Sequence, residues 1–170
     1  MAIETTTLIE IGKMFVPIVG ATVGAYFASR WTLSKAKKER FWDERRSSYR
    51  TVINAFEELG FFCDQSRAEH CCEPTLNIET KVDESLRTIS KYSVTGFLVF
   101  STKFYDVLVE ANKEILQAIY KTDEEKKPDR GDERAESEWR FVLANELGSV
   151  ITKFTPQLVE IAKSEEPIKI

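Results

Sequence analysis

Histidine and cysteine are scarce in this chain. Its 170 residues include one histidine, His70, and three cysteines, Cys63, Cys71 and Cys72. Structural zinc sites usually space their cysteines by two to four residues, and the adjacent Cys71 and Cys72 cannot easily bind one tetrahedral ion together. Three cysteines also make no disulfide framework in a reducing compartment. We therefore expect reduced thiols, no metal site and no cofactor.

The motifs that usually indicate catalysis are missing as well. There is no Gly-x-Ser-x-Gly elbow, and Gly20-Ala-Thr-Val-Gly24 lacks the Gly-Lys-Ser/Thr ending of a phosphate-binding loop. The acids of residues 123–133 are interleaved with Lys and Arg and do not have the carboxylate spacing of a calcium-binding loop. The sequence therefore predicts that the protein is not an enzyme.

Charge is absent from residues 14–29, which are almost entirely apolar or small. With Leu8, Ile9 and Ile11 the apolar stretch reaches about 22 residues, and a bilayer core requires about 20. A cleaved signal peptide would place its basic residues before the apolar core, whereas here a basic run follows it. We predict a transmembrane helix over residues 8–29, and the alternative is a helix buried in a protein core.

The charges on either side of this stretch differ in sign. Residues 30–50 contain eight basic and three acidic residues, whereas residues 1–29 contain two acids and one lysine. Because basic residues stay on the cytoplasmic side, we expect Met1 outside the membrane and residues 30–170 in the cytoplasm. The residues expected at the lipid headgroups are Arg30, Trp31, Lys35, Lys37 and Lys38.

Side chains in the predicted span are sorted by size when the residues are advanced by about 100° around a helix. One third of the circumference holds mostly bulky apolar residues, and the rest holds mainly small ones. Gly20-x-x-x-Gly24-x-x-x-Ala28 lies on the small side, and such a series lets two helix backbones approach closely. It predicts that these three residues form helix contacts in a homo-oligomer.

The polar residues of this region fall on the same side of the helix. They are Glu10, Lys13, Thr22 and Ser29. Charged side chains within a membrane normally face protein or a water-filled interior, so we expect these four residues to line a pore. The alternative is a monomeric anchor in which the glycines have no special role.

Three apolar stripes at helical spacing follow the predicted span and indicate an all-α fold, with a cytoplasmic bundle of three or four helices over residues 30–164. The first stripe comprises Phe41, Trp42, Arg45, Tyr49, Val52, Ile53, Phe56, Leu59, Gly60 and Cys63. The second runs through residues 82–120, where the β-branched segment around Gly96 leaves open whether there is one helix, two helices or a short strand. Residues 121–137 are almost entirely polar and are expected to form a charged loop. The third stripe lies beyond this loop, over residues 139–161, and Pro156 is expected to kink its helix.

The charge of the remaining chain restricts its partners. Residues 51–170 contain 15 basic and 23 acidic residues, so we expect no extensive nucleic-acid binding there. The predicted partners are the lipid bilayer, further copies of the chain, and a cytosolic protein or small molecule that acts as a trigger.

The order of these parts resembles the small transmembrane effectors of bacterial antiviral systems, which include accessory proteins of RNA-targeting CRISPR systems and channel-forming effectors of abortive infection. The resemblance rests on the Gly- and Ala-rich span, on the basic segment Phe41-Trp42-Asp-Glu-Arg-Arg46 with Tyr49, and on the small helical bundle. Some of these proteins have a HEPN-like bundle with a nuclease signature of Arg, four to six residues, then His. Positions 63–65, where that Arg would precede His70, are Cys, Asp and Gln, so no ribonuclease of this kind is expected.

These observations predict a homo-oligomeric membrane pore or ion channel with a cytoplasmic bundle for sensing and oligomerisation, and the resemblance implies a bacterial inner membrane and a role in antiviral defence. The alternative is a membrane-tethered scaffold or adaptor that binds a cytosolic protein. A membrane-bound hydrolase is the weakest of the three interpretations because no catalytic constellation is recognisable.

Overall fold

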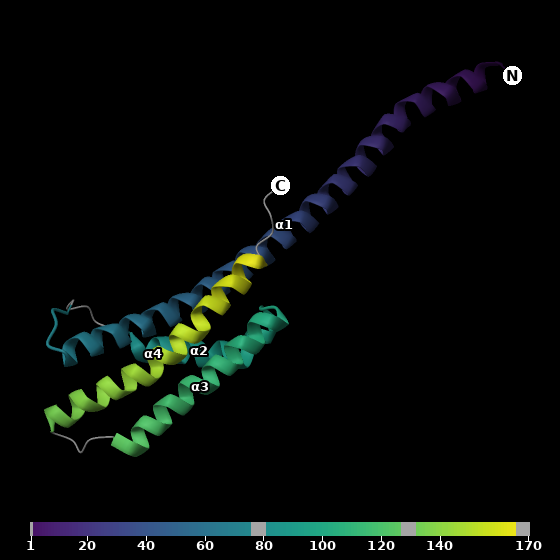
Figure 1. Ribbon diagram of the computed structural model, residues 1–170. Helices are drawn as coiled ribbons and strands as arrows, with labels where there is room; N and C mark the ends of the chain where they lie inside the picture. The colour runs from purple at the N-terminus through teal and green to yellow at the C-terminus, as the bar shows by residue number, and fades with distance from the viewer. Residues whose placement is uncertain (1, 76–80, 127–131, 166–170) are drawn as a thin grey trace. The chain divides into compact units, whose positions relative to one another are not determined.

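The computed structural model describes residues 2–75, 81–126 and 132–165, and for residues 2–25, 27, 125, 126 and 133 it describes the backbone alone. All regular elements in this range are helical, which confirms the predicted all-α fold (Figure 1). They are α1 (Ala2–His70), α2 (Val82–Thr95), the short 3-10 helix η1 (Gly96–Leu98), α3 (Thr102–Lys126) and α4 (Glu133–Ser164). The chain divides into two compact units, Met1–Glu44 and Arg45–Ile170, and α1 contributes to both.

In the first unit, every described side chain of α1 is exposed, which covers Tyr26 and residues 28–44. The polar contacts here are local and follow the helical repeat. The Arg30 guanidinium donates to the Tyr26 hydroxyl at 3.0 Å, and the Thr32 hydroxyl donates to the carbonyl of Ala28 at 2.8 Å. This segment therefore buries no apolar stripe of its own within the described chain.

In the second unit, the later part of α1 packs with α2, α3 and α4 around one apolar core. Each helix contributes residues three or four positions apart, so one face of each is buried. The largest fully buried side chains include Phe56 of α1, Ile89 of α2, Phe104 of α3, and Leu147 and Phe154 of α4. The prediction of a bundle of three or four helices is confirmed.

Side-chain caps fix where α3 and α4 begin. The Ser101 hydroxyl accepts the Phe104 N–H at 3.2 Å, and the Asp132 carboxylate accepts the N–H groups of Arg134 and Ala135 at 3.1 Å. Each cap satisfies donors that the first turn of a helix leaves without a helical partner.

The open question about residues 82–120 is settled in favour of two helices. α2 ends at Thr95, and η1 and a short turn separate it from α3. A Cβ atom built on Gly96 would lie 2.7 Å from the Phe100 ring, so the chain turns here because glycine lets an aromatic ring pack against its backbone.

The charged loop expected over residues 121–137 is shorter in the structure. α3 continues to Lys126 and α4 begins at Glu133, so both ends of the expected loop are helical. Thr122 explains the first difference, because it is buried and its hydroxyl donates to the carbonyl of Ala118 at 2.8 Å. α4 also continues through Pro156.

Among the described residues, no helical stretch is both long enough and apolar enough to span a bilayer. This finding does not cover the predicted span over residues 8–29, because no side chain of residues 8–25 or of residue 27 is described.

Candidate functional site

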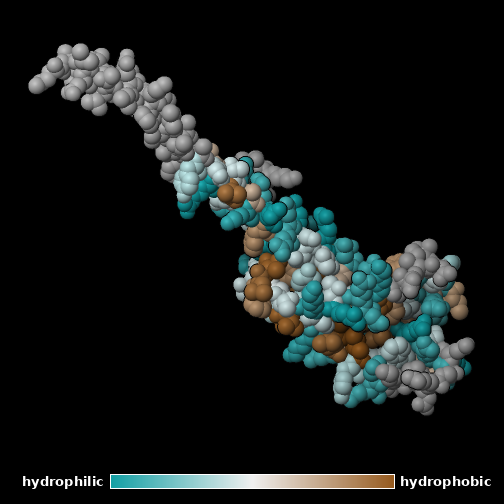
Figure 2. Space-filling view, turned by 180° about the vertical axis from the view of Figure 1, so that it is seen from behind, coloured by the Kyte–Doolittle hydropathy of each residue, from teal (hydrophilic) through white to brown (hydrophobic). Residues whose placement is uncertain are grey.

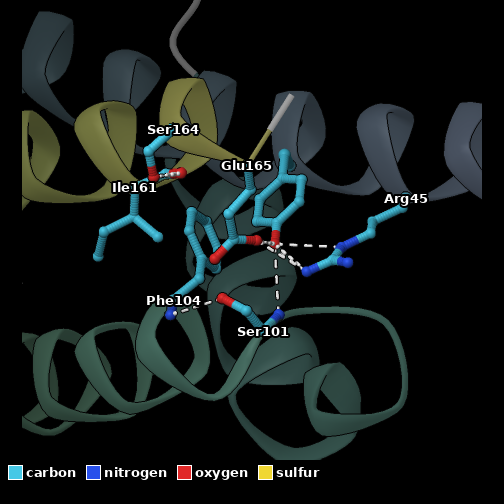
Figure 3. Close-up of polar contacts among 7 residues, drawn as sticks. Arg45, Ser101, Phe104, Ile161, Ser164 and Glu165 are labelled. Carbon is cyan, nitrogen blue, oxygen red and sulfur yellow. Dashed lines mark hydrogen bonds and ion pairs between the residues drawn. The ribbon is translucent and has the colours of Figure 1, made fainter. Parts of the chain in front are cut away.

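The most connected polar cluster of the bundle joins three separate parts of the chain at one end of it (Figure 3). Arg45 lies where α1 enters the bundle, Glu165 follows the last turn of α4, and Ser101 precedes α3. The Arg45 guanidinium lies 2.7 Å from a Glu165 carboxylate oxygen, and both side chains are largely buried. The C-terminal end of α4 is thereby held against α1 and the turn before α3.

The Tyr49 hydroxyl lies at the centre of this cluster. It donates a hydrogen bond to the Glu165 carboxylate, and it accepts hydrogen bonds from Arg45 Nη2 at 3.0 Å and from the Ser101 N–H at 3.3 Å. Every polar group in this cluster that leaves water therefore finds a partner, which buried polar networks require for stability.

Two aromatic rings pack against the Tyr49 ring. The Tyr49 ring lies 5.0 Å from the Phe100 ring and 4.5 Å from the Phe104 ring, and Phe100 also lies 5.5 Å from Tyr92. These separations are typical of interacting aromatic pairs. The packing fixes the position of Tyr49, so the hydroxyl is presented to Arg45 and Glu165 in one orientation.

The contacts of this cluster tether α1, the turn before α3 and the end of α4 to one another. The cluster contains a cation, an anion and a phenol hydroxyl that donates to the anion, and it contains no histidine or thiol. Among the side chains that the structure describes, no group of His, Cys, Asp and Glu could hold a metal ion.

The three cysteines and the histidine lie in different environments and do not form one site. Cys63 is buried in the core, where desolvation raises the pKa of its thiol to about 11. Cys71 and Cys72 are exposed beyond the end of α1, and the His70 ring stacks on Phe141 at 4.2 Å. Because a thiol must be deprotonated to act as a nucleophile, Cys63 is inert near neutral pH.

The remaining predicted site residues belong to α1. For the proposed contact residues Gly20 and Gly24, and for Glu10, Lys13 and Thr22, the structure describes the backbone alone. The others are exposed along the first unit, namely Ala28, Ser29, Arg30, Trp31, Lys35, Lys37 and Lys38.

Two groups of apolar side chains remain exposed on the bundle. One lies along α3 and comprises Val109, Leu116 and Tyr120, with Lys113 between them. The other lies at the end of α2 and on η1, and comprises Val94, Phe97 and Leu98. Figure 2 shows brown, hydrophobic surface over the region of η1 and α3. Both groups are available to a partner.

The chain was compared with protein-family models, with curated proteins and with solved structures. None of the three comparisons finds a match.

Sequence reasoning placed Arg45 and Tyr49 on one helical stripe, but it did not find their partner. Glu165 lies 120 residues after Arg45, and no local pattern connects the two positions. The sequence pattern also did not predict that residues of η1 would be exposed, because they belong to a β-branched segment whose secondary structure it left open.

Proposed function

We propose that this chain is a homo-oligomeric protein of the bacterial inner membrane, with its N-terminus outside, whose N-terminal helices assemble into a pore or channel. The observation that supports this proposal most is the run of residues 14–29 without a charge, followed directly by a basic segment. By resemblance to small membrane effectors of antiviral systems, the pore would act in defence, with the bundle as its cytoplasmic sensing and oligomerisation domain.

In the proposed assembly, the side of the span that carries the small and polar residues faces away from lipid. Gly20, Gly24 and Ala28 would bring neighbouring helices into close contact, since small side chains let backbones approach where lipid supplies no hydrophobic drive. The polar side chains on the same side would then face the interior of a closed ring.

The described part of the first unit agrees with a helix that meets its partners outside this chain. Residues 28–44 leave all their side chains exposed, including Trp31, which is 79% exposed. Tryptophan and basic residues are enriched at the interface between membrane and water. Arg30, Trp31, Lys35, Lys37 and Lys38 are the residues that we assign to the lipid headgroups.

Cysteine accessibility separates a pore from a dry anchor. We would place single cysteines at Thr22, Ser29, Val19 or Val23 in a full-length protein carrying Cys71→Ser and Cys72→Ser, and retain the buried Cys63. In a pore, a water-soluble thiol reagent reacts at Thr22 and Ser29, but not at Val19 or Val23 on the lipid side. Absence of reaction at Thr22 and Ser29, together with an unchanged membrane potential in cells, would overturn the pore.

Cross-linking in membranes tests the contact face. Gly20→Leu or Gly24→Leu should dissociate the oligomer, because a branched side chain holds two backbones apart, while Val19→Leu should have little effect. If all three variants cross-link equally, the span does not assemble the protein.

A membrane-tethered adaptor is the second candidate, and the exposed stripe on α3 favours it. Val109, Leu116 and Tyr120 repeat at helical spacing on a surface that the bundle leaves open. Such a stripe is typical of a helix that packs against another protein. A detergent-purified protein that is monomeric would favour this function over the pore.

A further inference from the structure

The end of α2 and the following η1 form an apolar tip, which we define as Val94, Phe97 and Leu98. Their side chains are 68%, 61% and 70% exposed, although Val94 and Phe97 each follow a buried residue in sequence. Ser93 and Gly96 are buried and hold the backbone against the bundle, and Gly96 lies directly over the Phe100 ring. The tip is therefore a fixed projection of large apolar side chains toward solvent.

The residues nearest the tip in sequence include basic and no acidic side chains. Residues 85–105 contain three basic residues, Arg87, Lys91 and Lys103, and the acids that flank this segment are Glu84 and Asp106. Residues 51–170 as a whole carry eight more acids than bases. All three basic side chains are exposed. An apolar projection bordered by cations in an otherwise acidic domain is complementary to an anionic lipid surface.

The tip lies at the end of the bundle where the chain enters it. The Tyr49 ring contacts Phe100, and the Tyr49 hydroxyl accepts the Ser101 N–H, so the turn carrying the tip packs beside the first helical turns after Arg45. Figure 1 shows the start of α3 and the end of α4 at the same end of the bundle. Between the proposed span and Arg45 there are 15 residues, which reach at most about 22 Å as a helix.

We infer that the tip inserts into the headgroup region of the same anionic membrane that holds the N-terminal span. This second contact rests on the proposed membrane anchoring. Because the span already keeps the tip near the bilayer, a weak intrinsic affinity is sufficient for occupancy. Phe97 and Leu98 enter between the headgroups, while Lys91 and Lys103 contact lipid phosphates.

The experiment places an environment-sensitive fluorophore on the tip of the full-length protein. The background is again Cys71→Ser with Cys72→Ser, since the buried Cys63 does not react, and the label is attached at Leu98→Cys. The protein is reconstituted into vesicles of phosphatidylcholine and phosphatidylglycerol, some of which carry a nitroxide quencher on the lipid headgroup. We expect a blue-shifted emission that the lipid-borne quencher suppresses.

A matched label at Glu73→Cys serves as the control. Glu73 is exposed just beyond the other end of α1, about 37 Å from Arg45 measured along that helix from residue 45 to residue 70. The emission of the label at position 73 should be the same in vesicles as in detergent, and the lipid-borne quencher should not affect it. In the Leu98→Cys protein, the double variant Lys91→Glu with Lys103→Glu should weaken quenching.

Three results would overturn the inference in different ways. If the protein floats with the vesicles but the Leu98 label remains in water, the anchoring stands and the tip contact is wrong. If the label is shielded from water without lipid quenching, the tip binds protein instead. If the protein does not float with the vesicles at all, the proposed anchoring fails, and the tip contact fails with it.

Discussion

One helix, α1, has two kinds of surroundings along its length. From Tyr49 onward it supplies core residues every three or four positions, whereas from residue 28 to residue 44 all its side chains are exposed. A helical segment that buries nothing is marginal in water, because most helical stability in proteins comes from packing. The comparison teaches that the packed part is stabilised within the chain, while the exposed part has no such packing among the described residues.

The largest expected difference between the two regions is in the stability lost when a phenylalanine is replaced by alanine. Phe104→Ala should lower the free energy of unfolding by about 3–5 kcal/mol, because Phe104 is fully buried in the core. Phe41→Ala, at a residue that is 52% exposed in the first unit, should change it by less than about 1 kcal/mol. Urea unfolding in detergent, followed by circular dichroism, measures both, and equal losses would show that residues 28–44 also pack in a core.

The polar cluster should contribute less than the core. Tyr49→Phe should cost about 1–2 kcal/mol, because it removes the hydroxyl shared by Arg45, Glu165 and the Ser101 N–H. Tyr120→Phe on the exposed face of α3 should change stability by less than about 0.5 kcal/mol. A Tyr49→Phe protein as stable as the wild type would mean that the cluster does not hold the end of α4.

Burial of Cys63 makes the stability of the packed region depend on pH. The folded-state pKa of about 11 lies above the ordinary value of 9.0, so the folded protein retains the thiol proton that the unfolded chain loses. The resulting stability is complete below pH 9 and is lost as the pH rises toward 11, by on the order of 1–2 kcal/mol. Comparison with Cys63→Ala across this range isolates the effect, and identical pH profiles would contradict it.

Alanine substitutions at two glycines of the packed region should change the free energy of unfolding in opposite directions. A Cβ atom on Gly148 would lie 1.8 Å from the Arg67 guanidinium, whereas one on Gly60 would lie 3.5 Å from Ile151, an ordinary contact. Gly148→Ala should therefore cost about 1 kcal/mol by displacing Arg67 from the Ala144 carbonyl. Gly60→Ala should stabilise α1 by about 0.5–1 kcal/mol, and thermal unfolding curves that shift the same way for both would refute this contrast.

Much of the bundle could be predicted from sequence, because apolar residues at helical spacing mark the buried faces directly. The same pattern could not decide what happens at Gly96, since the outcome depends on the Phe100 ring packing against it. It also missed the start of α4, although the Asp132 cap could have indicated it. A buried polar residue, Thr122, extended α3 into a segment whose composition favoured a loop.

The candidate sites could be predicted less well, for two physical reasons. The contact between Arg45 and Glu165 joins residues far apart in the chain, and only packing brings them together. The exposure of Phe97 and Leu98 depends on which side of a turn faces the core, and local sequence does not determine this. By contrast, the predicted span rests on composition alone.

The account depends most on residues 8–29 crossing a membrane, and alkaline carbonate extraction of bacterial membranes tests this directly. The full-length protein should stay in the membrane pellet and float with lipid, whereas a variant with Val16→Asp, Val19→Asp and Val23→Asp should be released, because aspartate in the span is strongly disfavoured. Release of the wild-type protein by carbonate would contradict both the pore and the anchored adaptor.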